Sequence, residues 1–193
     1  VCLATKGHTV YCVGRNKGKI ERLLAGSPII YEESLEELLR NALSKGNFIP
    51  STDLKNVVQN SEVSFICVGT PSRADGSIDL SQVEDASKEI GLGLREVEEY
   101  KVVVVKSTVV PGTTENLVVP TIERFSDKKV GVDFGVCTNP EFLREGNAVE
   151  DFMKPDRIVM GVNDEKSKFE LEKIYSCFDC PKLVTNISTA ELI

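Results

Sequence analysis

The stretch "KVVVVKST", residues 101–108, decides how the rest of the chain should fold. Its four consecutive valines are apolar and β-branched, and a run of this length suits a strand that is buried on both faces. Such strands belong to parallel sheets that helices cover on either side. The stretch therefore predicts a central strand of a parallel α/β sheet, and two hydroxyl residues, Ser107 and Thr108, end it.

Segments on both sides of this strand alternate between strand and helix patterns. Further strands are predicted over 8–14, 62–69, 132–138 and 156–161, and helices over 17–26, 34–46, 53–60, 79–94, 113–125 and 164–178. Asp79 and Asp164 suit the N-caps of their helices. Gly91 and Gly93 weaken the end of one helix, and Pro120 predicts a kink in another. The alternation predicts an α/β fold with a doubly wound, mostly parallel, Rossmann-like sheet.

The first residues read as the end of a helix. The stretch "VCLATKG" begins at Val1, not at a methionine, and Gly7 suits the helix end. A helix in an α/β chain usually follows a strand. We therefore expect a fragment, whose first strand and loop lie upstream of the sequence.

Composition narrows the class of protein. The net charge of −7 and the pI near 4.9 argue against a nucleic-acid partner or an anionic membrane surface. No apolar run reaches membrane-spanning length and nothing resembles a signal peptide, so we expect a cytoplasmic protein. Four of the six cysteines lie in apolar segments, which suits buried, reduced thiols. The pair in "CFDC", residues 177–180, lacks the further ligands that zinc needs, so we expect no metal site.

Three predicted strands end in polar or turn-forming residues, over 65–71, 104–114 and 136–146. Ligands of open α/β sheets bind beyond the carboxyl ends of the strands, so these endings should meet along one ligand-binding edge. The turn at Thr70 could approach a ribose or phosphate, or could be an ordinary strand-to-loop turn. Residues 111–114 suit either an anion-binding helix N-terminus or a simple capped helix start.

The stretch "CTNPEFLREG", residues 137–146, carries two carboxylates four residues apart. Asn139 can cap a helix, and Gly146 can end it, which predicts one short helical turn with Glu141 and Glu145 on the same face. Like charges at this spacing repel, so the pair suits a ligand crevice better than a purely structural turn. A solvated surface turn is the alternative.

Several stretches together resemble one family. "CVGTPSRADGSIDLS", "KSTVVPGTT", "NPEFLREGNAVEDFMKPDRIVMG" and "STAELI" are similar, in this order, to segments of the UDP-glucose/GDP-mannose dehydrogenase family. "IYEESLEELL" also resembles the family's "IYEPGLEELL", with Glu33 and Ser34 in place of Pro and Gly. The resemblance covers nearly the whole chain, and within the family it is greatest to the UDP-glucose 6-dehydrogenases. It divides the chain into a cofactor-binding domain over 1–187 and, over 188–193, the start of a central helix through which a full-length homodimer forms.

The resemblance implies an NAD-dependent oxidoreductase that oxidises the C6 alcohol of a nucleotide sugar to a carboxylate in two steps, through a cysteine thioester. By position, Glu141 is implied to be the acid/base of the hydrolytic water, and Thr108 to help hold that water. The resemblance also implies which residues contact the cofactor. These are Arg15, Lys19, Thr70, Ser107, Thr108 and Glu145. The sugar nucleotide is implied to lie along Glu141, Phe142, Leu143, Arg144 and Glu145.

The sequence departs from the family pattern at three places. The Gly-rich dinucleotide loop is expected upstream of Val1, and the catalytic cysteine and a lysine are expected downstream of Ile193, so the chain alone should not turn over. The third place is the end of the strand over 8–14, where an acidic residue usually binds the adenosine ribose. Gly14 and Arg15 stand there, and Arg15 could pair with a 2′-phosphate, which predicts relaxed or NADP-leaning cofactor use.

Two other classes of function stay open. Within the family, GDP-mannose and UDP-N-acetylmannosamine dehydrogenases are the alternatives. A dinucleotide-binding module without catalysis is a different class. Such a module would need no hydrolytic acid, and the presence of Thr108, Glu141 and Glu145 weighs against it.

Overall fold

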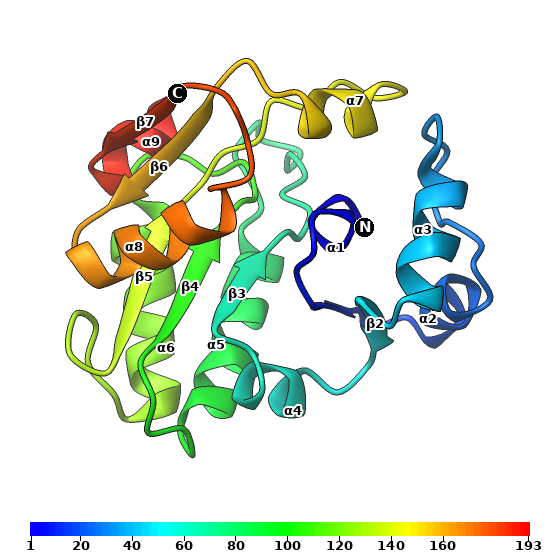
Figure 1. Ribbon diagram of the computed structural model, residues 1–193. Helices are drawn as coiled ribbons and strands as arrows, with labels where there is room; N and C mark the ends of the chain where they lie inside the picture. The colour runs from blue at the N-terminus through cyan, green and yellow to red at the C-terminus, as the bar shows by residue number, and fades with distance from the viewer.

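The computed structural model describes all residues, 1–193, and contains two sheets (Figure 1). The strands are β1 (Val10–Val13), β2 (Phe48–Ser51), β3 (Val63–Ile66), β4 (Lys101–Val105), β5 (Phe134–Thr138), β6 (Ile158–Val162) and β7 (Lys182–Thr185). The helices are α1 (Cys2–Thr5), α2 (Lys17–Leu24), α3 (Leu35–Ser44), α4 (Leu54–Gln59), α5 (Ser81–Leu94), the π-helix η1 (Thr114–Val118), α6 (Val119–Ser126), α7 (Ala148–Met153), α8 (Glu165–Ile174) and α9 (Ile187–Leu192).

The larger sheet confirms the predicted architecture. Its strand order is β3-β4-β5-β6-β7, and every neighbouring pair is parallel except β5 and β6. Helices α4, α5 and α6 cover one face, and α8 covers the other (Figure 1). The sheet is therefore mostly parallel and doubly wound, as the alternation of segments predicts.

The valine run explains why β4 lies at the centre of the core. Side chains alternate across a strand, so Val103 and Val105 enter the core beneath α5 and α6, while Val102 and Val104 enter the core beneath α8. All four valines are at most 1% exposed. Burial of both faces is the feature that the unbroken apolar run predicts.

The smaller sheet forms a separate unit with its own core. Strands β1 and β2 pair in parallel, and α1, α2 and α3 pack with β2 around a cluster that includes Ala4, Ile20 and Leu39. Strand β2 is absent from the sequence-based prediction because Pro50 lacks a ladder N–H. The structure accommodates Pro50 in an edge strand, opposite Cys12.

Helix ends agree with several predictions from sequence. The side chain of Asp164 accepts a hydrogen bond from Ser167 N and caps α8. The predicted N-cap at Asp79 is wrong by one residue: Leu80 is the N-cap of α5, and Asp79 before it accepts from Ser81 N at 2.9 Å. The change of helix type from η1 to α6 falls just before Pro120, which stands in the first turn of α6.

Gly91 and Gly93 do not simply weaken α5; both are buried where α5 packs against its neighbours. A Cβ atom on Gly93 would lie 2.8 Å from Val58 Cβ in α4, and one on Gly91 would lie 3.0 Å from the backbone oxygen of Ile122 in α6. Glycine therefore permits three helices to approach closely on one face of the sheet.

The elements without a sequence prediction are short. Besides β2, they are β7, which is half exposed at the sheet edge, and α7 of six residues. Helix α9 lies where the resemblance implies the start of a central helix. The prediction that cysteines in apolar segments are buried holds for Cys137, whereas Cys2 and Cys12 are half-buried. It is wrong for Cys67, which is exposed just beyond β3, an edge strand of the sheet. All six cysteines are free thiols.

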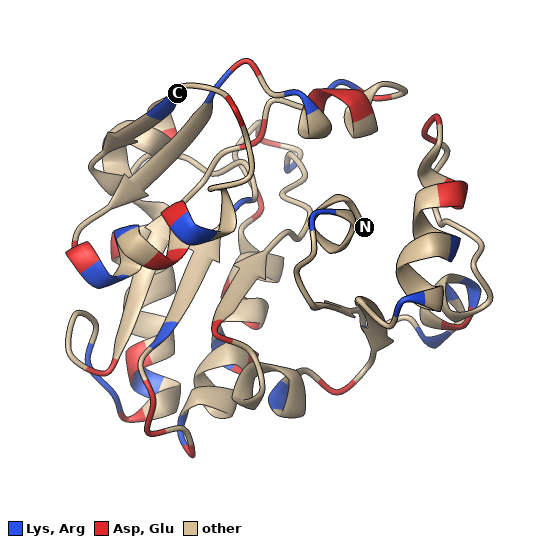
Figure 2. Cartoon of the chain, in the orientation of Figure 1, with Lys and Arg blue, Asp and Glu red and all other residues tan.

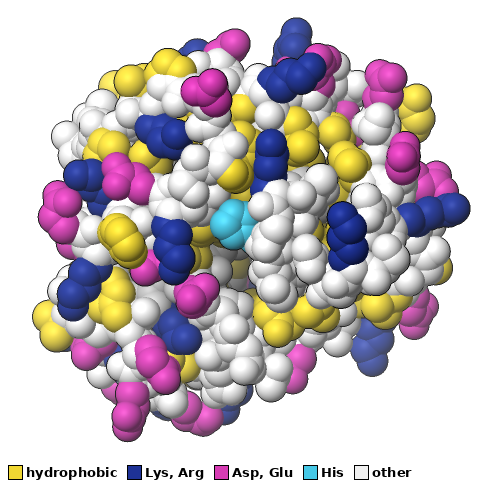
Figure 3. All heavy atoms as spheres, viewed as in Figure 1, with side chains coloured by type: hydrophobic (Ala, Val, Ile, Leu, Met, Phe, Trp, Pro, Cys, Tyr) yellow, Lys and Arg dark blue, Asp and Glu magenta, His cyan; other side chains and the backbone are white.

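Charge is distributed without a dominant patch. Lysine and arginine residues alternate with aspartate and glutamate residues over both units (Figure 2), and basic and acidic side chains also mix on the face in Figure 3. None of the helices combines the length and the apolar character that crossing a bilayer requires.

Candidate active site at the carboxyl edge of the sheet

Hydrogen bonds join the ends of β3 and β4. Ser107 Oγ donates to Val68 O at 2.7 Å, and Thr70 Oγ1 donates to Thr108 O at 2.8 Å. Because β3 and β4 are parallel, both endings lie at the same edge, and the hydroxyl groups tie the two loops together. The predicted meeting of these strand ends is confirmed.

A buried polar cluster joins the ends of β4 and β5. The Asn139 side-chain oxygen accepts from Lys106 Nζ at 3.0 Å and from the Tyr175 hydroxyl at 2.5 Å, while its Nδ2 donates to Val159 O at 2.7 Å. Burial lowers the pKa of the Lys106 ammonium, an effect that the thiol of Cys67 and the carboxylate of Glu141 oppose. Burial also raises the pKa of the Tyr175 hydroxyl.

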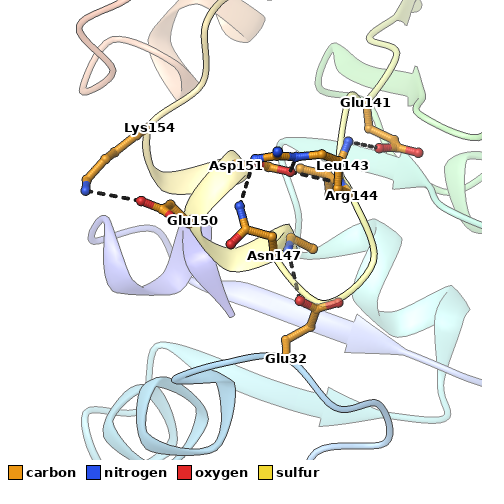
Figure 4. Close-up of polar contacts among 9 residues, drawn as sticks. Glu32, Glu141, Leu143, Arg144, Asn147, Glu150, Asp151 and Lys154 are labelled. Atoms are coloured by element: carbon orange, nitrogen blue, oxygen red, sulfur yellow. Dashed lines mark hydrogen bonds and ion pairs between the residues drawn. The ribbon is translucent and has the colours of Figure 1, made fainter.

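The predicted helical turn over 139–146 is wrong. Residues 139–144 form an extended loop, with a turn only at 145–146, so Glu141 and Glu145 do not share a helix face. Asn139 cannot cap a helix because its side chain belongs to the buried cluster, and its backbone N–H continues β5 by donating to Val105 O. Glu141 instead bends back on the loop and accepts from Leu143 N at 2.6 Å (Figure 4).

The second half of this loop is held by Arg144 and Asp151. Asp151 accepts from the backbone N–H of Arg144 at 2.9 Å and from its guanidinium at 3.1 and 2.6 Å (Figure 4). The Asn147 amide donates to the same carboxylate at 3.0 Å. The hydrogen bonds from Arg144, joined by that of Asn147, hold the pKa of Asp151 well below its usual range.

A pocket of about 640 Å³ lies beside this loop. Its walls come from the loop itself, from α7 and the segment after it, and from the end of α8. The Arg157 guanidinium lies over the Phe142 ring, 4.3 Å from its centroid, and fixes one side of the pocket. The loop that the resemblance assigns to the sugar nucleotide therefore borders a space large enough for a ligand.

The remaining candidate residues differ in how free their side chains are. Thr108 is exposed and its hydroxyl makes no hydrogen bond within the chain, whereas the hydroxyls of Ser107 and Thr70 are used between strand ends. The Lys19 side chain is exposed on the first turn of α2 and unpaired. Arg15 makes an exposed ion pair with Asp85 of α5 at 3.0 Å, so its guanidinium already has an anionic partner.

The segment 111–114 binds a carboxylate of the chain itself. Glu191 in α9 accepts from Gly112 N at 2.6 Å and from Thr114 N at 2.7 Å. Of the two alternatives for this segment, the structure has the capped helix start, and the cap comes from a residue 77 positions away. The cap fixes the loop that begins at Thr108 against α9.

Four residues of this edge have no role in the interpretation of the sequence: Glu32, Lys106, Asp151 and Glu191. Each lies inside a stretch that is similar to segments of the family. Its hydrogen-bond partner, however, is either far away in the sequence or in a loop, where hydrophobic periodicity gives no signal. The isolated lysine that ends the valine run was the one available signal, because a charge beside a buried strand needs a partner.

The fold and the polar loops at the carboxyl edge of the larger sheet together define the class of protein domain. A doubly wound, mostly parallel sheet with polar loops at its carboxyl edge is a dinucleotide-binding domain of the Rossmann type. The sequence profile of the UDP-glucose/GDP-mannose dehydrogenase family, NAD binding domain, matches residues 1–179. The chain belongs to this family, and it is the NAD-binding domain that it represents.

Individual relatives support the same assignment. The chain is 45% identical over 192 residues to GDP-mannose 6-dehydrogenase of Pseudomonas aeruginosa, covering 100% of this chain and 44% of the relative. It is 40% identical over 188 residues to UDP-glucose 6-dehydrogenase of Rickettsia conorii, covering 97% and 41%. The chain thus spans less than half the length of these curated relatives.

Solved structures give the same fold. A ternary complex of GDP-mannose dehydrogenase from Pseudomonas aeruginosa superposes with a TM-score of 0.97 at 45% identity, over 99% of this chain and 44% of that chain. A UDP-glucose dehydrogenase from Pyrobaculum islandicum gives 0.94 at 46% identity, over 99% and 44%. The predicted fold class and NAD as the cofactor are therefore confirmed.

Proposed function

We propose that the chain is the cofactor-binding part of a longer NAD-dependent dehydrogenase that oxidises the C6 alcohol of a nucleotide sugar to a carboxylate. One observation carries the proposal. The Glu141–Glu145 loop lies at the carboxyl edge of the sheet and is anchored there by Asn139, whose side chain accepts from Lys106 after β4. Loops at this edge are where ligands of such sheets bind.

UDP-glucose and GDP-mannose are the two candidate substrates. The motifs of the sequence favour the UDP-glucose 6-dehydrogenases, whereas the relatives named GDP-mannose 6-dehydrogenase are up to 45% identical. Both substrates present the same primary alcohol to the same edge, so the reaction type does not depend on which one binds.

The residues present fit NAD. The hydroxyl of Thr108 and the ammonium of Lys19 are exposed and unpaired, so both are available to a ligand. The Thr70 and Ser107 hydroxyls instead shape the two loops that would border the cofactor. When bound, NAD accepts the hydride that leaves the C6 carbon in each oxidation.

The chain's own residues supply proton transfer and positioning. Glu141 is exposed at the edge, and its carboxylate can accept a proton from the water that hydrolyses the thioester. The free hydroxyl of Thr108 can hold that water by a hydrogen bond. The cysteine that forms the thioester is part of the proposal for the longer protein and is none of the six cysteines here.

NADH formation tests the proposal. The full-length protein is incubated with NAD and either UDP-glucose or GDP-mannose, and absorbance is followed to completion with the sugar limiting. We expect two NADH per sugar with one of the two substrates. No NADH from either sugar nucleotide, in a protein that still binds NAD, would favour the non-catalytic dinucleotide-binding module.

A further inference from the structure

Glu32 connects the two units of the chain. It lies in the loop between α2 and α3, in the unit built on β1 and β2. Its carboxylate accepts from Gly146 N at 3.0 Å and from Ala148 N at 2.9 Å, across separations of 114 and 116 residues. Figure 4 shows Glu32 pointing toward the segment around Asn147. A side chain from the smaller unit thus holds the segment that follows β5 of the larger sheet.

The site that receives Glu32 lacks a local partner. Asn147 is the N-cap residue of α7, but its side chain makes no cap hydrogen bond, and its Nδ2 donates to Asp151. The N–H groups at the start of α7 would then face water or remain unpaired. Glu32 accepts from Ala148 N, the first of them, and from Gly146 N in the preceding turn, and hydrogen bonds to charged groups are the stronger kind.

The contact falls at the end of the loop that the proposed function assigns to the sugar. The buried partners of Asn139 fix the chain two residues before Glu141, and Glu32 fixes Gly146, the residue after Glu145. Gly146 has φ of +81°, so the chain turns there into a conformation that favours glycine. The six residues between these two anchors, 140–145, have no regular secondary structure of their own.

We propose that Glu32 is a positioning residue for the substrate loop: it holds the carboxyl end of residues 141–145 in place from the opposite unit. This inference rests on the proposed function, because that function assigns the loop to the sugar nucleotide. Without Glu32, the loop samples several conformations, of which one can bind the sugar. The apparent affinity for the sugar then equals the intrinsic affinity multiplied by the fraction of molecules in that conformation.

The neighbour of Glu32 provides a matched control. Glu33 carries the same charge one residue away, but it is exposed and makes no hydrogen bond in the structure. Glu32→Gln keeps the shape of the side chain, and its one oxygen can still accept one of the two hydrogen bonds. Its NH2 group is a donor, so it cannot accept the other. Glu32→Ala removes both hydrogen bonds.

The test uses the full-length enzyme in three variants, Glu32→Gln, Glu32→Ala and Glu33→Gln. We expect KM for the nucleotide sugar to rise about tenfold in Glu32→Ala, less in Glu32→Gln, and to stay at the wild-type value in Glu33→Gln. KM for NAD should change less than KM for the sugar in both Glu32 variants, because Glu145 alone among the loop residues is also a cofactor-contact position. A general loss of folding would instead lower the amount of active enzyme and leave KM for the sugar and KM for NAD unchanged.

Amide hydrogen exchange gives a second, function-independent readout. The N–H groups of Gly146 and Ala148 should be protected in wild type and in Glu33→Gln, and should exchange faster in both Glu32 variants. Unchanged exchange would overturn the contact, and a sugar KM that is equal in all variants would overturn the positioning role. A wild-type protein that oxidises no nucleotide sugar would instead count against the proposed function.

Discussion

The Lys106 ammonium lies 3.0 Å from the side-chain oxygen of Asn139, and this contact joins the residue after β4 to the residue after β5. The Tyr175 hydroxyl donates to the same oxygen, and Asn139 Nδ2 donates to Val159 O in β6. One buried amide therefore fixes where the loop over residues 140–146 leaves the sheet. A charge that ends a buried strand is tolerated because this partner is present.

Asn139→Ala should destabilise the fold by about 3 kcal/mol, since the Tyr175 hydroxyl and Val159 O lose their partner and Lys106 keeps only its bond to the backbone oxygen of residue 139. Tyr175→Phe should cost only about 1 kcal/mol, because Asn139 keeps its other two hydrogen bonds. Urea unfolding of the three proteins measures the difference. Equal losses for the two variants would show that the cluster is not organised around Asn139.

Gly93→Ala should destabilise the protein by about 1–3 kcal/mol, although alanine is the better helix former. The added methyl group would meet Val58 at 2.8 Å. Gly18→Ala in α2 is the matched control, since its nearest atom is Asn16 Oδ1 at 3.4 Å and helix propensity should dominate. The thermal unfolding midpoint should therefore fall in Gly93→Ala and rise in Gly18→Ala. A higher midpoint in Gly93→Ala would contradict the close packing of Gly93 against Val58.

Ser34→Gly should stabilise the protein by about 0.5–1 kcal/mol. Ser34 has φ of +62°, in the left-handed region, and its side chain makes no cap hydrogen bond. Glycine removes the steric cost there but adds entropy to the unfolded chain, which leaves a modest gain. Ser44→Gly, in the last turn of the same helix, should instead lose about 0.5–1 kcal/mol by calorimetry.

Asp85→Ala should raise the affinity for NADP relative to NAD about twofold to fivefold, the range that an exposed ion pair allows. The substitution frees the Arg15 guanidinium from its carboxylate partner, so it can pair with a 2′-phosphate. Fluorescence titration with both cofactors measures the ratio. The double variant Arg15→Ala/Asp85→Ala should lose the gain, and retention of the gain would contradict this role of Arg15.

Asp151 should make stability depend on pH. Its folded pKa lies below its unfolded value, so its ionised form stabilises the folded loop fully above about pH 4 and loses this effect as the pH falls through the folded pKa. Asp151→Asn should therefore lower the urea midpoint at pH 7 and approach wild type as the pH is lowered below about 4. Asp179→Asn, which changes an exposed carboxylate without a hydrogen bond, should match wild type at both values.

Much of the fold follows from local patterns. The valine run, the helix caps and the alternation of segments predict β4, the parallel sheet and the meeting of its strand ends. The pattern fails at β2, where Pro50 argues against a strand, and at residues 139–146. There, the local signals for a helical turn are overridden because Asn139 is used in the core.

The candidate site also contains residues that the sequence indicates and residues that only the structure shows. Thr108 ends one predicted strand and Glu141 follows another by three residues, and the resemblance to the family assigns roles to both and to Glu145. Glu32 and Glu191 are not predictable in this way, since each binds backbone N–H groups more than 70 residues away. Only the packing of the units shows which N–H groups lack a local partner.

The central claim is that Glu141 acts in the hydrolytic step at this edge, and single-turnover kinetics on the full-length enzyme test it most directly. Glu141→Gln is compared with Glu89→Gln, which alters an exposed carboxylate of α5 that makes no hydrogen bond. Wild type and Glu89→Gln should release the sugar acid after two NADH per sugar, whereas Glu141→Gln should form NADH and then stall as an enzyme-bound acyl species. Release of product by Glu141→Gln at the wild-type rate would contradict the account.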